Sequence, residues 1–433
     1  MFLRGWLRKG GPAELPPLSK LDGEVAKDDP MDAEVDERRL SATDSAFGVE
    51  EIIRIDFLTA LPYELAVNVV MEVNDFYTVE SIAMVSKRWR KLATDKEVWK
   101  KLYFGQWGSR TPESTLKKLR HANRDWKRLH FQRQLLERNW SKGIVTAKYL
   151  SGHHDAVYCI QFDHNQIISG SRDRTIKFWD LESRKCTQTL EGHKGSVLCL
   201  QYDLRYIVTG SSDTTIIIWD YETKKKLRTL EGHTAPVLDV RFKDNIVVSC
   251  SKDCTIKIWD ISNGRLRRTL QGHHAAVNAI HLHQNYVASA SGDCIIKLWD
   301  IDTGRCIRDF AGHARGLACV QFDGEYLVSG SNDKTIRIWN ARTGECLRTL
   351  TGHEDLVRTL CFDRRRIVSG SYDQTIKVWD FRTGDPLMTL KGAHSSWVFH
   401  VQMDAAKIIS ASQDKKIVIW DFTNKVENVM DFI

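Results

Sequence analysis

Most of the chain alternates between short apolar runs and polar turns, and this pattern repeats about every forty residues. One such run is GSRDRTIKFWD at 170–180, and related runs lie at 210–220, 250–260 and 330–340. Gly-His pairs begin forty residues apart, at 152, 192, 232, 272, 312 and 352, and a seventh copy, GAH at 392–394, carries one inserted residue. Gly-His and Trp-Asp pairs at this period predict a β-propeller with four strands in each blade, and seven copies predict seven blades.

Three residue types stand at constant distances from each of these histidines. A hydroxyl follows sixteen positions later: Ser169, Thr209, Ser249, Ser289, Ser329, Ser369 and Ser410. An acid follows after twenty: Asp173, Asp213, Asp253, Asp293, Asp333, Asp373 and Asp414. A tryptophan follows after twenty-six: Trp179, Trp219, Trp259, Trp299, Trp339, Trp379 and Trp420. Seven identical sets indicate a structural hydrogen-bond network in each blade, not seven catalytic or metal sites.

The first and last repeats are incomplete in a complementary way. Residues 146–153, TAKYLSGH, match the last strand of a repeat unit, but the strands that should precede them are missing. The seventh unit, 394–421, supplies those strands. We therefore expect residues 146–150 to form the outer strand of the last blade, which would close the ring and remove a free sheet edge.

Helical patterns precede the repeats. Residues 56–104 predict three or four short helices, with Pro62 at a helix start, Thr78 before another helix, and Thr94 and Glu97 as a capping box. Leu65, Val69 and Val70 belong to an apolar face. A module of about 45 residues buries little core alone, so we expect a partner to share this face. Residues 115–140 look helical throughout, with an apolar stripe formed by Leu116, Leu119, Trp126, Leu129 and Leu136.

Length and charge add to this organisation. A chain of 433 residues predicts two or more domains. Residues 22–37 hold eight acids and one lysine and predict a disordered tail. Residues 100–142 hold twelve Lys or Arg against three Asp or Glu, a net charge of +9, which fits either a solvated helix face or a patch for nucleic acid or acidic lipid. The sequence contains no apolar run of about 18 residues and no secretory h-region, so neither a membrane-spanning helix nor a signal peptide is expected.

The ten cysteines contain no CxxC pair and mostly occupy strand positions, which predicts reduced, buried thiols and a cytoplasmic or nuclear protein. The sequence also contains no P-loop and no metal-ligand cluster. Neither an enzymatic activity, a metal nor a cofactor is expected.

Two rings of variable residues should surround one mouth of the propeller. The ring just before each fixed acid is Arg172, Ser212, Lys252, Gly292, Asn332, Tyr372 and Gln413. The ring five residues after each histidine is Tyr158, Leu198, Leu238, Asn278, Ala318, Arg358 and Phe399. Arg172, Lys252, Arg315 and Arg358 beside aromatic and aliphatic side chains favour an anionic, partly apolar ligand, although Asp155 and Asp355 lie near. A phosphopeptide fits this mixture; nucleic acid and ordinary surface charge are the alternatives.

The segment LPYELAVNVV…VSKRWRKLATDKEVWKKLY resembles an F-box, the module that docks on the Skp-type adaptor of cullin–RING ubiquitin ligases. With the repeats, residues 56–421 resemble F-box/WD-repeat substrate receptors, and most of all the β-TrCP (beta-transducin repeat-containing) branch. The resemblance rests on AVYCIQFD…IISGSRDRTIK, GSVLCLQYD…IVTGSSD, SCSKD, AAVNAI…ASASGD, RGLACVQF and LVRTLCFD. That branch binds a degron of Asp-Ser-Gly and a second serine, with both serines phosphorylated.

The resemblance implies two sets of site residues. The phosphodegron contacts would be Tyr158, Arg172, Ser196, Ser212, Leu238, Asn278, Arg315, Gly316, Leu356, Arg358 and Tyr372. The adaptor contacts would be Leu61, Pro62, Leu65 and Val69. The chain departs from the branch at Cys294, where the branch has an arginine, and at Asn332, where it has a serine. Residues 1–55 show no clear match to the branch's dimerisation segment, which leaves a homodimer open.

The sequence thus predicts a multidomain α plus all-β chain. Residues 1–55 would be a disordered acidic tail, 56–104 an F-box, 105–142 a basic helical linker and 143–433 a seven-bladed WD-repeat propeller. The chain would be a non-catalytic substrate-recognition subunit, with a Skp-type adaptor, cullin and RING subunits and phosphorylated proteins as partners. The alternatives are an F-box/WD receptor of another branch with a different degron, a WD-repeat scaffold with no ligase role and a nucleic-acid binder.

Overall fold

The computed structural model describes residues 56–108 and 125–427. Six helices lie in these ranges: α1 (Phe57–Ala60), α2 (Tyr63–Met71), α3 (Phe76–Ala83), α4 (Lys87–Ala93), α5 (Lys96–Trp107) and α7 (Trp126–Lys142). The predicted acidic tail and the Leu116 and Leu119 positions of the predicted helix fall outside the described residues. None of the described helices is long and apolar enough to cross a membrane.

The caps of the short helices differ from the prediction. Pro62 does stand immediately before α2. Thr78, however, lies inside α3, whose N-cap is Asp75, and the backbone N–H of Thr78 donates to the Asp75 carboxylate at 2.8 Å. The N-cap of α5 is Asp95 and not Thr94, whose hydroxyl donates to Arg90 O at 2.8 Å at the end of α4. In both places an aspartate carboxylate is the better acceptor for the unpaired N–H groups at the start of the helix.

Seven four-stranded antiparallel sheets form the propeller, as the repeats predict. The inner strands are β2 (Val157–Phe162), β6 (Val197–Tyr202), β10 (Val237–Lys243), β14 (Val277–His283), β18 (Leu317–Phe322), β22 (Val357–Phe362) and β26 (Val398–Met403). The second strands are β3 (Gln166–Ser171), β7 (Tyr206–Ser211), β11 (Ile246–Ser251), β15 (Tyr286–Ser291), β19 (Tyr326–Ser331), β23 (Arg366–Ser371) and β27 (Lys407–Ser412).

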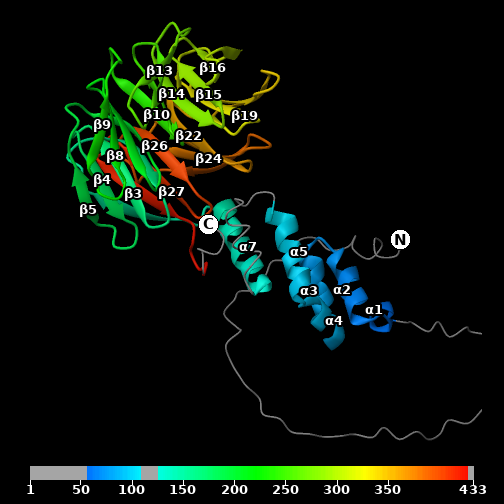
Figure 1. Ribbon diagram of the computed structural model, residues 1–433. Coiled ribbons are helices and arrows are strands. Elements are labelled where there is room, and N and C mark those ends of the chain that lie inside the picture. Colours follow the sequence, from blue (N-terminus) through cyan, green and yellow to red (C-terminus); the bar gives the residue numbers. More distant parts are fainter. Residues whose placement is uncertain (1–55, 109–124, 428–433) are drawn as a thin grey trace, which may run out of the picture. The chain divides into compact units, whose positions relative to one another are not determined.

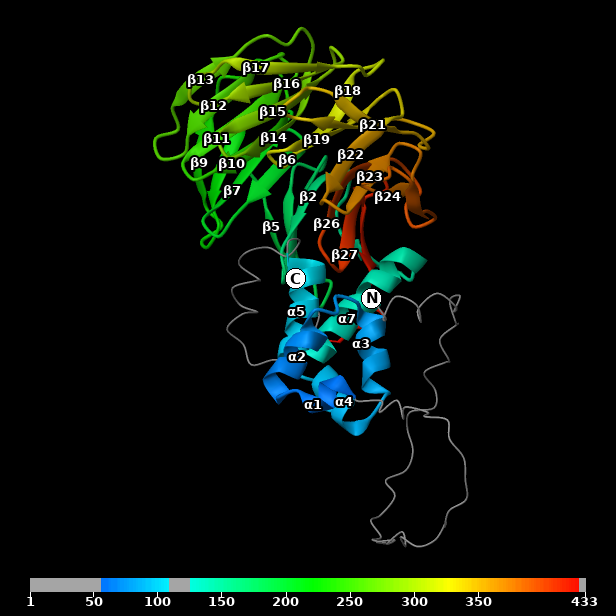
Figure 2. The same cartoon turned by 90° about the vertical axis from the view of Figure 1, so that its right-hand side faces the viewer.

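The third strands are β4 (Ile176–Asp180), β8 (Ile216–Asp220), β12 (Ile256–Asp260), β16 (Ile295–Asp300), β20 (Ile336–Asn340), β24 (Ile376–Asp380) and β28 (Lys416–Asp421). The outer strands are β5 (Cys186–Leu190), β9 (Lys226–Leu230), β13 (Leu266–Leu270), β17 (Cys306–Ala311), β21 (Cys346–Leu350), β25 (Pro386–Leu390) and β1 (Thr146–Ser151). The sheets stand around one central axis, and the red strand β27 lies beside the first blade in both views (Figure 1, Figure 2).

Strand β1 closes the ring by joining the last blade. It pairs antiparallel with β28, from Thr146 opposite Asp421 to Ser151 opposite Lys416. The predicted closure is therefore confirmed. Glutamine side chains add links between blades: Gln161 accepts from Tyr202 N at 2.7 Å, and Gln402 accepts from Phe162 N at 3.0 Å across the junction of last and first blade.

The repeated polar residues form the predicted network in every blade. In the first blade, Trp179 Nε1 donates to Ser169 Oγ at 2.8 Å, and the His153 ring bonds Ser169 and Asp173 through its two nitrogens, each at 2.8 Å. A neutral imidazole with its proton on Nδ1 satisfies all of these groups. The same three contacts recur in the other six blades.

Apolar packing fills the space between the blades. The strand cysteines Cys159, Cys199, Cys319 and Cys361 are buried, and burial raises the pKa of the Cys319 thiol to about 12. All ten cysteines are free thiols, as expected. The buried cysteines act as small core residues, whereas Cys186, Cys306 and Cys346 are exposed, contrary to the expectation of buried thiols.

Helix α7 packs on both α5 and the propeller. Trp126, Leu129 and Leu136 of the predicted stripe are buried. Near its start, His130 lies 4.6 Å from the Trp107 ring of α5, measured between ring centroids.

At its end, three residues of α7, which we call the α7 clasp, contact the propeller: Glu137, Asn139 and Trp140. Glu137 pairs with Arg365 and Arg366, and Asn139 donates to Phe422 O at 2.7 Å. Trp140 stacks on the Phe422 ring, with 3.8 Å between centroids and 10° between planes. Helix α7 thus contacts the helical module with one end and the propeller with the other.

Candidate functional site

A ring of backbone hydrogen bonds builds one mouth of the propeller. In every blade the residue before the fixed Asp donates its N–H to the residue three positions after the histidine, at 2.9–3.0 Å. The pairs are Arg172–Ala156, Ser212–Ser196, Lys252–Pro236, Gly292–Ala276, Asn332–Gly316, Tyr372–Leu356 and Gln413–Trp397. We call these pairs, with the residues five positions after each histidine, the propeller mouth. Because the backbone bonds are identical, the side chains can vary without cost to the blade.

Arg172 and Asp173 face different environments. The Arg172 side chain is 58% exposed, and its Nε lies 3.7 Å from Oδ2 of the half-exposed Asp155. The Asp173 side chain is buried and accepts from His153 and from Thr175 Oγ1 at 2.6 Å. Burial by itself raises the pKa of Asp173. The hydrogen bonds from His153 and Thr175 lower it by more, so the pKa lies well below its usual value. Arg172 is thus available to a ligand, whereas Asp173 belongs to the blade.

The cations differ in how far they reach solvent. Lys252 and Arg315 are exposed at the mouth. Arg358 is half-buried, lines the central cavity and donates to Ala318 O at 3.1 Å. Cys294 occupies a turn position with φ of 71°, the same backbone position and φ as Arg174 in the first blade. This residue lies in the turn that precedes the third strand of its blade, β16.

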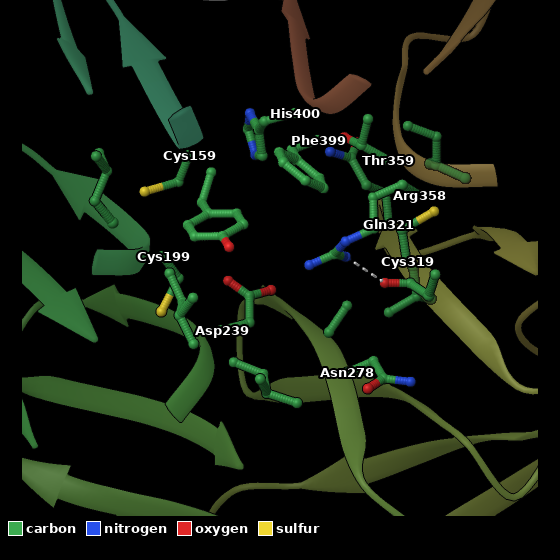
Figure 3. A pocket seen from close by; sticks show the side chains of 18 of the residues that line it. Cys159, Cys199, Asp239, Asn278, Cys319, Gln321, Arg358, Thr359, Phe399 and His400 are labelled. Carbon is green, nitrogen blue, oxygen red and sulfur yellow. Dashed lines mark hydrogen bonds between the residues drawn. The ribbon is translucent and has the colours of Figure 1, made fainter. Parts of the chain in front are cut away.

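The cavity below the mouth contains an acid that the sequence interpretation missed. Asp239 and Arg358 point towards the same space in Figure 3. Asp239 accepts from Ile280 N at 3.0 Å, and Arg241 lies 3.5 Å away, yet burial dominates and raises the pKa of Asp239. The sequence could have indicated this residue, because Asp239 is the only acid among the residues six positions after the histidines. The other six are Cys159, Cys199, Ala279, Cys319, Thr359 and His400. The cavity volume of about 60 Å³ holds only a few water molecules, so a peptide would lie across the mouth.

The other predicted phosphodegron residues line the same mouth. Tyr158, Leu238, Asn278 and Leu356 are half-buried there. Asn278 donates to Leu317 O at 2.6 Å, and Ser196 N donates to Ser212 Oγ at 2.8 Å. Gly316 and Tyr372 also lie at the mouth, where the Gly316 carbonyl accepts from Asn332 N and Tyr372 N donates to Leu356 O. The structure therefore brings all eleven residues to the mouth or the upper cavity.

An aromatic residue at the mouth was also missed. Trp397 stacks on Tyr372, with 4.5 Å between ring centroids and 7° between planes. The ring of Phe399 lies 4.9 Å from Tyr158 and 5.9 Å from Tyr372. The series of residues three positions after the histidines, which already included Ser196, Gly316 and Leu356, would have identified Trp397.

The helical module carries an exposed apolar face. Leu65 and Val69, one turn apart on α2, are 50% and 40% exposed, while Pro62 is exposed and Leu61 is half-buried. Further exposed apolar side chains on this module are Phe57, Tyr77, Met84 and Val85, which the sequence interpretation did not include. Large exposed apolar side chains gathered on one small module are typical of a protein-binding surface.

Comparison with known families identifies the propeller. The description "WD domain, G-beta repeat" matches residues 145–180, 184–220, 224–260, 264–300, 304–340, 344–380 and 384–421, more than half of the chain.

The chain belongs to the WD-repeat family.

Ahead of its repeats, this WD-repeat protein matches the description "F-box-like" over residues 58–105. It is therefore an F-box/WD protein.

Curated relatives of this WD-repeat protein include subunits of SCF ubiquitin ligases. It is 31% identical over 170 residues to "Probable E3 ubiquitin ligase complex SCF subunit sconB" of Arthroderma otae, covering 33% of this chain and 25% of the relative. It is 31% identical over 167 residues to an F-box protein of Saccharomyces cerevisiae, covering 33% and 26%. It is 35% identical over 152 residues to "F-box/WD repeat-containing protein 7" of Drosophila melanogaster, covering 33% and 11%. The chain thus spans between about a tenth and a quarter of these relatives' length.

Among solved structures, the computationally designed Ika8 protein has a TM-score of 0.55 and is 38% identical, over 62% of this chain and 85% of that one. This match supports the repeat fold.

Proposed function

We propose that this F-box/WD protein is the substrate-recognition subunit of a Skp–cullin–F-box ubiquitin ligase. The F-box would bind a Skp-type adaptor and, through it, the cullin and RING subunits, while the propeller mouth would bind a phosphorylated degron. The receptor itself carries out no chemistry in this role. The observation that carries the proposal is one chain with an F-box-like module, whose apolar face is exposed, ahead of seven WD repeats.

Charge at the mouth supports a phosphorylated ligand. Arg172, Lys252 and Arg315 are exposed on three different blades. A phosphate accepts charge-assisted hydrogen bonds from arginine, often two at once. Cations spread over several blades suit a ligand with two separated phosphates. We therefore propose a doubly phosphorylated degron, as the β-TrCP resemblance implies.

Adaptor binding is tested with Leu65→Asp. A carboxylate at the centre of an apolar contact is left without a partner and costs several kcal/mol, so the variant should lose the Skp-type adaptor in a pull-down. The matched control is Leu204→Asp, the same change at a leucine that is 85% exposed between β6 and β7 of the propeller. Retention of the adaptor by Leu65→Asp would contradict the proposed contact.

Degron binding is tested with peptides carrying two, one or no phosphoserines, titrated against the full chain. Tightest binding of the doubly phosphorylated peptide is expected. A preference for one phosphate would favour a receptor of another F-box/WD branch. Failure to bind any adaptor would favour a scaffold, and salt-sensitive binding of nucleic acid in place of phosphopeptide would favour the basic segment as a nucleic-acid site. A location in the cytoplasm or nucleus remains a prediction.

A further inference from the structure

Four aromatic rings form a continuous group across three neighbouring blades of the propeller mouth. We call them the aromatic arc: Tyr158, Phe399, Trp397 and Tyr372. Tyr158 belongs to the first blade, Trp397 and Phe399 to the last, and Tyr372 to the sixth. Trp397 and Tyr372 are stacked at 4.5 Å, and Phe399 meets both Tyr158 and Tyr372 within 6 Å. The arc therefore bridges the closure of the ring.

Trp397 is larger than its place in the fold requires. The residues at the same position of the other blades are Ala156, Ser196, Pro236, Ala276, Gly316 and Leu356, and every one accepts the same backbone hydrogen bond. That bond uses the carbonyl alone. The Trp397 side chain is 41% exposed, whereas the other tryptophans in the described residues are buried or half-buried. An indole that stays this exposed, at a position where the fold uses only the backbone carbonyl, is typical of a binding residue.

The arc lies between two cations. Arg172 stands in the first blade and Arg358 in the sixth, on either side of the last blade, whose inner strand β26 touches both β2 and β22. A ligand that crosses the last blade meets a guanidinium, an aromatic platform and a second guanidinium. The third and fourth blades present Pro236 with Lys252 and Ala276 with Gly292 in the corresponding positions, which include a cation but no aromatic ring. Cations are spread around the mouth, but its aromatic rings thus gather on one side.

We propose that Trp397 and Tyr372 form a stacking subsite for an aromatic side chain of the degron, placed beside a phosphorylated residue. This inference rests on the proposed function and adds a sequence preference to it. The phosphate engages Arg172 or Arg358, and the neighbouring aromatic ring packs on the surface of Trp397 that Tyr372 and Phe399 leave uncovered. Aromatic pairs of this kind add roughly 2- to 12-fold in affinity beyond area burial.

The test is a set of doubly phosphorylated peptides that differ only in one residue near a phosphoserine, which is phenylalanine, leucine, alanine or glutamate. That residue is scanned through each position between and next to the two phosphoserines. Each peptide is titrated against the full chain by fluorescence anisotropy. Wild type should prefer phenylalanine over alanine at one position by roughly 2- to 12-fold. Trp397→Ala should lose this preference and Trp397→Phe should keep it.

The matched control is Tyr149→Ala, which removes an exposed aromatic ring on β1 that is not one of the mouth residues and should keep the preference. Thermal melts establish that each variant is folded. An equal preference in wild type and Trp397→Ala, with phosphopeptide binding intact, overturns the stacking subsite and leaves the proposed function standing. Binding that ignores phosphorylation in every peptide overturns both. Stacking of a single-stranded oligonucleotide on Trp397 without phosphopeptide binding also overturns both.

Discussion

Arg172 and Asp173 are adjacent in the sequence, but their side chains have different partners. The backbone N–H of Arg172 is used by the blade, and its side chain is left in solvent beside Asp155. Both carboxylate oxygens of Asp173 accept hydrogen bonds from within the blade. A binding residue and a structural residue can therefore be separated by single substitutions.

Arg172→Ala should weaken binding of a doubly phosphorylated peptide 10- to 150-fold and leave the melting temperature nearly unchanged. The loss is that of a charge-assisted contact, about 1.5–3 kcal/mol, and an exposed side chain contributes little to stability. Peptide titration by fluorescence anisotropy measures the affinity. The control is Arg174→Ala, an exposed arginine two residues away in the same turn. Wild-type affinity in a folded Arg172→Ala variant would show that the mouth does not bind the phosphate at this residue.

Asp173→Ala should have the opposite effect. The change leaves the buried His153 ring, Thr175 and the backbone N–H of His154 without their acceptor. Unsatisfied buried groups cost about 1–3 kcal/mol each, so the free energy of unfolding should fall by at least that amount. Urea titration of the full chain measures it. Unchanged stability would mean that the network adds little to the fold of a blade.

Repetition decides which site residues can be predicted from the sequence. Positions at fixed distances from each histidine share one backbone environment, so Arg172, Tyr372 and the other ring members could be placed in advance. Asp239 and Trp397 occupy equivalent positions, but their importance depends on burial and stacking across blades, which spacing does not reveal. The caps at Asp75 and Asp95 were missed because the nearby threonines also fit capping patterns, and the competition is decided by local geometry.

The packing partners of helix α7 could not be predicted from the sequence pattern. Its apolar stripe predicts a buried face but not what covers it, because the covering residues are distant in the chain. In the structure the covering residues include Trp107 of α5 and Phe422 beyond β28. The ring closure by β1 was predictable, since it follows from counting strands in each repeat.

His130 of α7 should make the stability of the chain depend on pH. Its ring is buried, stacks on Phe76 at 5.2 Å and has no hydrogen-bond partner within residues 56–108 and 125–427. Burial lowers the pKa of His130 from 6.5 to about 4. Between these values the unfolded chain takes up a proton that the folded chain does not, so stability falls as pH falls from about 6.5 towards 4, by up to about 1.4 kcal/mol per pH unit.

His130→Phe should reduce this slope while keeping the aromatic packing. The slope will not vanish, because burial also lowers the pKa of His193, His233, His273 and His313 in the propeller. Urea unfolding at pH 7.5, 6.5 and 5.5 gives the difference between variant and wild type. The exposed His154→Gln serves as control. Identical slopes for wild type and His130→Phe would contradict the assignment.

At the scale of the whole molecule, α7 should act as a stiff spacer between the adaptor-binding module and the degron-binding propeller. Ubiquitin transfer requires the substrate to be held near a catalytic site on another protein, which is a proximity effect. Replacement of 115–140 by a Gly/Ser linker should preserve peptide binding and lower ubiquitination. That replacement also removes Trp126 and Leu129, which are buried with the helical module, so a narrower change is preferable.

The narrower change is Glu137→Ala combined with Trp140→Ala, which breaks the α7 clasp. It removes the ion pairs to Arg365 and Arg366 and the stack on Phe422, and it leaves the His130 side of α7 in place. Adaptor pull-down and phosphopeptide affinity should match wild type, because neither surface is touched. Ubiquitination of a bound substrate in a reconstituted ligase should fall several-fold, since the substrate then samples many positions relative to the catalytic subunit. Arg138→Ala, an exposed neighbour on the same helix, should have no effect. Full ubiquitination by the clasp variant, with both binding activities retained, would mean that the ligase does not depend on a rigid link.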